Sequence, residues 1–369
     1  MSGKDPSVTS REALASTGPG KQILKQGLFK SAGLKIFTRY KDEVERELPL
    51  FAKRFASDLL RAIREDSSPA STQQRFADVI GSSEMALSAS DTASIRSRLD
   101  SADVMQDRVG RILNSNFVKM TFPVLNALYD AANDSKDDAQ MRQDVVDGHI
   151  MAIDLSEPMD RIIDRDEDIE YLDDYKLMVP YILELARAKI SRGGPKVLES
   201  FEAGFADALD GQRMDAKLKM RPASITAEDM DYCYKKYRAV MGTAGRNMAM
   251  SKEPLGEIFY LGMARAAESV GCGNEIEDSI KGGMVKVPSW PLYYTMQTGD
   301  TKRGFEATLK KSQIYLEDAR LALDLLPDNF SHKEFLKFLF LTVDHYNQFW
   351  YKRLNGAGLW SQFQSNLPR

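Results

Sequence analysis

Apolar residues recur at the spacing of an α-helix along most of this chain, and that periodicity constrains the fold more than any other feature. One example is the run after Pro195, a residue suited to a first helical turn; it comprises Leu198, Phe201, Phe205 and Leu209, and Asp210-Gly211 is expected to end it. The single strand-like stretch, 284–287, is too short to support a sheet. The sequence therefore predicts an all-α fold.

Capping residues indicate where several of these helices begin and end. Thr226 and Asp229 resemble a capping box in which Asp replaces the usual Glu, and Ser331 with Glu334 forms a second box. The second box opens a helix over 335–350 that is apolar on every side, so we expect it to be buried or held by a partner. The Gly271-Cys272-Gly273 segment is expected to stop a helix.

A break at 221–224 divides the expected helices into two lobes. Residues 1–20 are rich in Ser, Thr, Gly and Pro and offer little to bury, so they are expected to form an arm. The expected domains are an N-terminal arm, an N-terminal helical lobe, a C-terminal helical lobe and a C-terminal arm, over 1–35, 36–222, 223–334 and 335–369.

Charge is segregated along the sequence, although the formal net charge is only -4. Residues 1–64 carry 13 basic and 7 acidic side chains, whereas residues 130–175 carry 16 acids and 4 bases. Residues 176–254 return to 14 bases against 10 acids. This distribution excludes a uniformly basic nucleic-acid binder but leaves room for a local basic groove.

Cysteine usage and hydropathy narrow the class of protein further. Two cysteines, Cys233 and Cys272, exclude a disulfide framework; we expect two reduced, buried thiols, with a single disulfide left open. The three histidines are too far apart to outline a zinc site. Because no signal peptide and no apolar run of about 18 residues occurs, the sequence predicts a soluble protein inside a cell or virion, with no membrane partner.

An acidic segment offers two kinds of metal chemistry. Asp164, Asp166 and Asp168 imitate the first ligands of a calcium loop, but Ile169 and Tyr175 occupy the positions of its required Gly and Glu. Asp160, Asp164 and Asp168 share one helix face, as a magnesium-dependent, diphosphate-using helical enzyme requires, but a solvated acidic face or an acidic linker is the favoured interpretation. The motifs of P-loop NTPases and of Gly-x-Ser-x-Gly hydrolases are missing from the sequence.

Three basic runs favour a groove that follows a sugar-phosphate backbone. In each run, basic residues alternate with aromatic or small ones, a composition that suits phosphate binding. A solvated surface is the alternative for each run taken alone. The candidate RNA-binding residues are Lys189, Arg192, Lys196, Lys235, Lys236, Arg238, Arg246, Lys302, Arg303, Lys310 and Lys311.

The region 253–320 resembles the C-terminal lobe of nucleoproteins of nonsegmented negative-strand RNA viruses, above all the paramyxovirus type. The resemblance rests on the order Glu253-Pro-Leu-Gly-Glu257, Glu277-Asp-Ser-Ile280, Ser289-Trp-Pro-Leu-Tyr-Tyr294 and Gly299. It implies two helical lobes with an RNA-binding cleft between them, and terminal arms that reach neighbouring copies. It also places RNA contacts near Lys189, Arg192, Lys196 and Arg246, and near Lys310 or Lys311.

The leading hypothesis from the sequence is thus a non-enzymatic viral nucleoprotein that coats single-stranded genomic RNA without sequence specificity. It needs no cofactor and no metal. Its expected partners are RNA, other copies of itself through the arms, and a viral polymerase with a phosphoprotein-type cofactor; its expected location is the virion and host cytoplasm, with the nucleus left open. The alternatives are a helical magnesium-dependent enzyme of the isoprenoid type and a helical scaffold or matrix protein without RNA.

Overall fold

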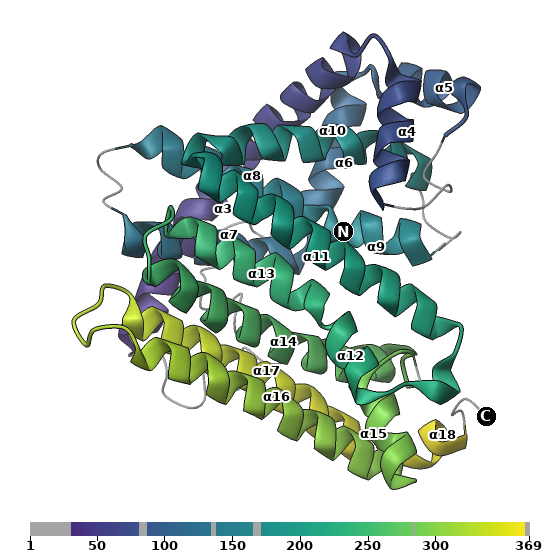
Figure 1. The fold of residues 1–369 in the computed structure, drawn as a ribbon, viewed down its shortest axis with the longest axis vertical. Coiled ribbons are helices and arrows are strands. Elements are labelled where there is room, and N and C mark those ends of the chain that lie inside the picture. Colours follow the sequence, from purple (N-terminus) through teal and green to yellow (C-terminus); the bar gives the residue numbers. More distant parts are fainter. Residues whose placement is uncertain (1–30, 81–86, 134–137, 165–170, 283–284, 366–369) are drawn as a thin grey trace, which may run out of the picture. The chain divides into compact units, whose positions relative to one another are not determined.

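The computed structural model describes residues 31–80, 87–133, 138–164, 171–282 and 285–365 (Figure 1). These residues form α-helices joined by short connections and 3-10 turns, and no strand occurs among them. The all-α fold expected from the sequence is therefore confirmed. None of the described helices combines the length and the apolar character needed to cross a membrane.

The chain divides into two compact units. The first unit comprises 1–39 and 203–369, and the second comprises 40–202. The division falls within two long helices, α3 (Ala32–Glu65) and α11 (Pro195–Lys219). The four domain ranges expected from the sequence stay a prediction.

Buried helices organise the second unit. Along α8 (Ala139–Asp154) nearly every residue from Val145 onward is buried, and α10 (Leu172–Ile190) packs beside it. At one end of α10, the fully buried Asp174 carboxylate accepts hydrogen bonds from Arg98 and Arg108, which ties three helices together. The remaining elements are α4 (Pro69–Ile80), α5 (Ala89–Leu99), α6 (Ala102–Leu113), α7 (Asn116–Ala132), α9 (Ser156–Asp164) and η3 (Ser191–Gly193).

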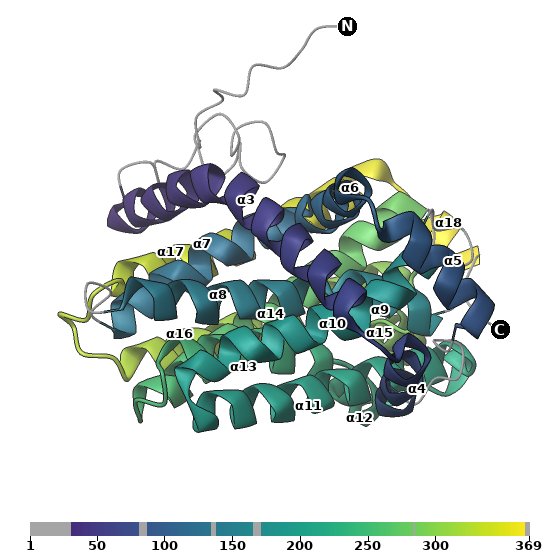
Figure 2. The ribbon, with the colours of Figure 1, turned by 90° about the horizontal axis from the view of Figure 1, so that it is seen from above.

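Three long helices run side by side in the first unit: α14 (Leu255–Gly282), α16 (Thr301–Asp324) and α17 (Lys333–Ala357) (Figures 1 and 2). Helix α13 packs on α14, and α15 packs on α16. The elements of this unit are η4 (Pro222–Ser224), α12 (Ala227–Cys233), α13 (Lys235–Met248), α14 (Leu255–Gly282), α15 (Trp290–Thr298), α16 (Thr301–Asp324), α17 (Lys333–Ala357) and α18 (Trp360–Ser365).

Two glycine positions expected to end helices lie inside them. Helix α11 continues past Gly211 to Lys219. A β-carbon at Gly211 would lie 2.6 Å from the backbone nitrogen of Lys236, so the glycine allows α11 to pack closely against α13. Helix α14 likewise continues through Gly271 and Gly273. A β-carbon at Gly273 would lie 2.0 Å from Oδ1 of Asn347 on α17. Both predictions were wrong because glycine marks a close helix–helix approach here rather than a helix end.

The capping predictions had different outcomes. Thr226 and Asp229 form the expected capping box, with both reciprocal hydrogen bonds present. The box at Ser331 does not form, because His332, with φ at +71°, is the N-cap of α17 and the Ser331 hydroxyl bonds to its imidazole. As expected, α17 is largely buried; it packs on α14 and α16 of the same chain.

Candidate functional site

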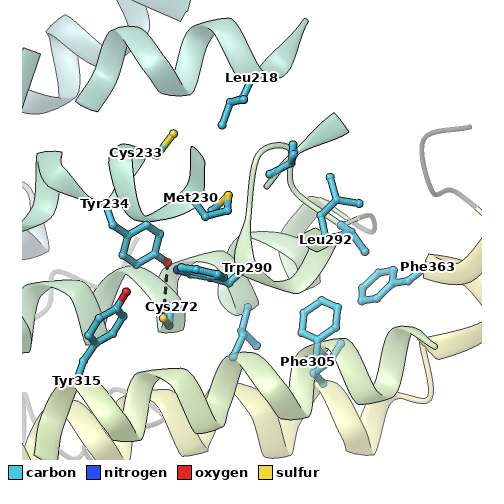
Figure 3. Packing of buried hydrophobic residues seen from close by; sticks show 14 residues of the cluster. Leu218, Met230, Cys233, Tyr234, Cys272, Trp290, Leu292, Phe305, Tyr315 and Phe363 are labelled. Atoms are coloured by element: carbon cyan, nitrogen blue, oxygen red, sulfur yellow. Dashed lines mark hydrogen bonds between the residues drawn. The ribbon is translucent and has the colours of Figure 1, made fainter. Parts of the chain in front are cut away.

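Six aromatic side chains gather in the first unit and define what we call the aromatic cluster. Ring centroids of Tyr234 and Trp290 are 5.9 Å apart, and those of Tyr234 and Tyr315 are 6.2 Å apart. Figure 3 shows these three side chains directed toward one another from different segments of the chain. The members of the cluster are Tyr234, Tyr237, Trp290, Tyr293, Tyr294 and Tyr315.

Local capping places Trp290 in this cluster. The Ser289 hydroxyl accepts a hydrogen bond from the Leu292 amide at 3.2 Å, which caps the short helix α15. The Trp290 amide donates to Oε2 of Glu275 on α14 at 3.0 Å. Helix α15 is therefore anchored to α14 by its first turn, and the indole is held in the interior.

Glu275 is a buried acid at the base of the aromatic cluster. Burial raises the pKa of Glu275 to about 8, although the Trp290 amide hydrogen bond and the nearby Lys286 ammonium oppose the shift. Near it, the Tyr234 hydroxyl donates to Sγ of Cys272 at 3.6 Å. Burial also raises the pKa of Cys272 well above its usual range, so this thiol is not an activated nucleophile. Cys233 and Cys272 are both free and buried, as expected.

Lys311 closes the aromatic cluster at the protein surface. Its Nζ lies 4.6 Å from the Trp290 ring centroid and 4.9 Å from that of Tyr315. It also lies 3.5 Å from Oδ1 of Asp231, which is half-exposed. We call Lys311, Asp231, Trp290 and Tyr315 the Lys311 edge; it combines a cation, a displaceable carboxylate and electron-rich ring faces.

A second charged group lies beside the cluster. Glu268 on α14 is fully buried and accepts hydrogen bonds from Arg238 at 2.8 Å and from Arg265 at 2.7 Å. The Arg265 guanidinium carbon is 5.7 Å from the Tyr315 ring centroid. Arg265 also lies 3.5 Å from the carboxylate of Asp318, so two guanidinium groups and two carboxylates balance next to the ring.

Six of the eleven cations selected from the sequence are ion-paired within their own unit. Their partners neutralise most of the charge expected to form a groove. The pairs are Lys189–Asp144, Lys235–Asp207, Lys236–Asp215, Arg238–Glu268, Arg246–Glu257 and Lys311–Asp231. The other five are exposed and form no ion pair with any residue that the structure describes: Arg192, Lys196, Lys302, Arg303 and Lys310.

Only two of the eleven, Lys236 and Lys311, lie over rings of the aromatic cluster. The sequence reasoning missed the two buried acids, Glu268 and Glu275. A signal was available, because they lie seven residues apart on one helix and therefore share a face that is otherwise buried.

The described residues do not fit a magnesium cluster. Asp160 lies on α9 and Asp164 ends that helix, but Asp168 lies outside the described residues. Within the described ranges, no three His, Cys, Asp or Glu side chains come together to hold a metal ion.

Solved structures share this fold, and two of them are named for an activity. A geranylgeranyl pyrophosphate synthetase from the archaeon Geoglobus acetivorans superposes with a TM-score of 0.53 at 12% identity, covering 78% of this chain and 99% of that one. A geranyltranstransferase from Methanosarcina mazei gives 0.52 at 15% identity, covering 76% and 97%. No family model matches the sequence. No curated protein matches it either. At this identity, the likeness shows a shared helical fold and no more.

The expectation of a viral nucleoprotein is wrong, because the solved structures that superpose on this chain include a geranylgeranyl pyrophosphate synthetase and a geranyltranstransferase. The same finding corrects the expectation of a non-enzymatic protein and of a virion or host-cytoplasm location. It also removes the expected partners: single-stranded RNA, neighbouring copies bound through terminal arms, and a viral polymerase with its phosphoprotein-type cofactor. The eleven cations thus lose the RNA backbone as their expected ligand.

Proposed function

We propose that this chain is an enzyme of the isoprenoid type that binds a prenyl diphosphate at the Lys311 edge. The shared fold supports the class of ligand, since both similar proteins are named for prenyl-chain substrates or products. A prenyl diphosphate has an apolar chain and an anionic head. The partly exposed rings of the aromatic cluster, Tyr237, Tyr293 and Tyr294, offer apolar surface for the chain, and Lys311 offers a cation for the head.

The observation that carries the proposal is the position of the Lys311 ammonium over Trp290 and Tyr315. The faces of these rings stabilise the positive charge of the ammonium, so they hold Lys311 at the edge of the cluster, where it meets an anionic head group. Asp231 currently pairs with Lys311 in a half-exposed position. A diphosphate carries more negative charge than a carboxylate, so it competes effectively for this ammonium.

Magnesium has no step in this proposal, because the described residues offer no cluster to hold it. Binding of the head group then depends on side-chain cations, and it is expected to persist in a chelator.

The test is calorimetric titration with geranylgeranyl diphosphate, with EDTA and then with Mg²⁺. We expect saturable binding in EDTA, weaker binding of inorganic pyrophosphate, and an affinity loss of about tenfold in Lys311→Gln. Lys302→Gln is the matched control, since Lys302 is an exposed lysine in the first turn of the same helix. Far-UV circular dichroism verifies that both variants fold.

Failure to bind in either buffer would contradict the proposal and favour a helical scaffold protein. Binding that requires Mg²⁺ would overturn the assignment of the head group to side-chain cations. Equal loss of affinity in both variants would remove the Lys311 edge as the site.

A further inference from the structure

Helix α16 presents an exposed row of residues with the spacing of a helix-pairing face. Steps of three or four residues separate its members, as in a heptad pattern. Three of them are large apolar side chains left largely exposed: Ile314 at 50%, Leu321 at 57% and Leu325 at 66%. The row, which we call the α16 seam, comprises Arg303, Ala307, Lys310, Ile314, Asp318, Leu321 and Leu325.

The other sides of α16 are already occupied within the first unit. Helices α14, α15 and α17 all pack against it, and its buried residues include Phe305, Tyr315 and Leu316. Figure 1 shows α16 beside α14 and α17. The seam is therefore a second apolar face on a helix whose first face is buried, and burial of that second face requires a partner.

The order of charges along the seam identifies the partner. The N-terminal half of α16 is basic, with Arg303 and Lys310, and the C-terminal half is acidic, with Asp318 and Asp324. An antiparallel copy of the same helix, centred on Ile314, places Lys310 opposite Asp318 and Ala307 opposite Leu321. It also brings Arg303 beside Asp324. This register pairs opposite charges twice by symmetry.

Other self-pairings conflict with the charges. A parallel pair places Lys310 against Lys310 and Asp318 against Asp318. In a second antiparallel register, Ile314 lies opposite Leu321 of the other copy. This register places Glu317 opposite Asp318 twice, once on each side of the two-fold axis. Like charges in direct opposition are destabilising, so these arrangements are disfavoured.

We propose that two copies of this chain associate through antiparallel α16 helices centred on Ile314. The proposal is independent of prenyl diphosphate binding, because it uses the outer face of α16 and not the Lys311 edge. Lys310 is exposed, while Asp318 lies 3.5 Å from Arg265 in its own chain and keeps a side-chain exposure of 44%.

Sedimentation-equilibrium measurements on the full chain test this with a charge swap. The wild type should dimerise at micromolar concentrations. Lys310→Glu should weaken the dimer about tenfold or more, because the introduced carboxylate then faces Asp318 of the other copy. Adding Asp318→Lys should restore most of the affinity, since the pair is re-formed with its charges exchanged. Recovery in the double variant cannot arise from a merely damaged fold.

Lys302→Glu is the control, because it makes the same charge change on α16 away from the seam, and it should leave the dimer unchanged. A functional dimer is expected to be populated at a protein concentration of about 100 µM. A wild type that stays monomeric at that concentration overturns the proposal. A dimer that resists Lys310→Glu also overturns it. Monomer in both the single and the double variant would do the same.

Discussion

The carboxylate of Glu275 accepts a hydrogen bond from the Trp290 amide at 3.0 Å while both side chains are buried. This contact joins the longest helix of the first unit, α14, to the short helix that carries Trp290. It places an ionisable group below the aromatic cluster, where its protonation affects stability.

Glu275 should make the first unit less stable as pH rises. Its pKa is about 8 in the folded chain against an ordinary value of 4.5, so between these values the folded chain holds a proton that the unfolded chain has lost. The free energy of unfolding therefore falls as pH rises from about 4.5 to 8. Urea unfolding at pH 5 and pH 8 should show a smaller loss for Glu275→Gln than for the wild type. Equal losses in the two proteins would show that Glu275 is ionised throughout.

The buried Glu268 should matter much more than a comparable surface acid. Glu268→Ala leaves Arg238 and Arg265 without their shared carboxylate; because these side chains keep exposures of 35% and 33%, we expect a cost of about 1–3 kcal/mol. Glu257 pairs with Arg246 but is half-exposed, so Glu257→Ala should cost less than about 1 kcal/mol. Denaturant titration of both variants checks this difference. Similar costs would mean that the network around Glu268 adds no stability.

Gly304 should tolerate no side chain, because it allows α16 to approach α15. A β-carbon there would lie 2.7 Å from the Thr295 backbone nitrogen and 2.9 Å from the Pro291 carbonyl oxygen. We expect Gly304→Ala to destabilise the chain by about 1–3 kcal/mol.

The matched control is Gly110→Ala in α6, where nothing lies within 4 Å of the added carbon. That change should raise stability by up to about 1 kcal/mol, because alanine is the better helix former. Thermal unfolding of the two variants should therefore give shifts of opposite sign. Shifts of the same sign would contradict the close packing at Gly304.

The helical character was predictable from sequence because apolar periodicity reflects which face of a helix is buried. The capping box at Thr226 was predictable for the same kind of local reason. The helix ends at Gly211 and Gly271 were mispredicted because a glycine needed for tertiary contact looks the same in sequence as one needed to end a helix. Such contacts depend on residues far away in the chain.

The site shows the same division between local and long-range information. The sequence located Lys311 as a basic residue, but not its position over Trp290, which lies 21 residues earlier in the chain. It found Lys235 and Lys236 without Asp207 and Asp215, the acids that neutralise them. Charge along a sequence therefore overstated the positive surface, and this overstatement favoured RNA as the ligand.

Binding at the Lys311 edge can be measured most directly through the fluorescence of Trp290. Replacing Trp350 and Trp360, the other two tryptophans of the chain, with Phe leaves Trp290 as the only indole. Titration of this variant with geranylgeranyl diphosphate should give a saturable change in emission that inorganic pyrophosphate does not reproduce. An emission spectrum that stays constant, while calorimetry on the same sample shows the lipid binding, would place the ligand elsewhere and contradict the account.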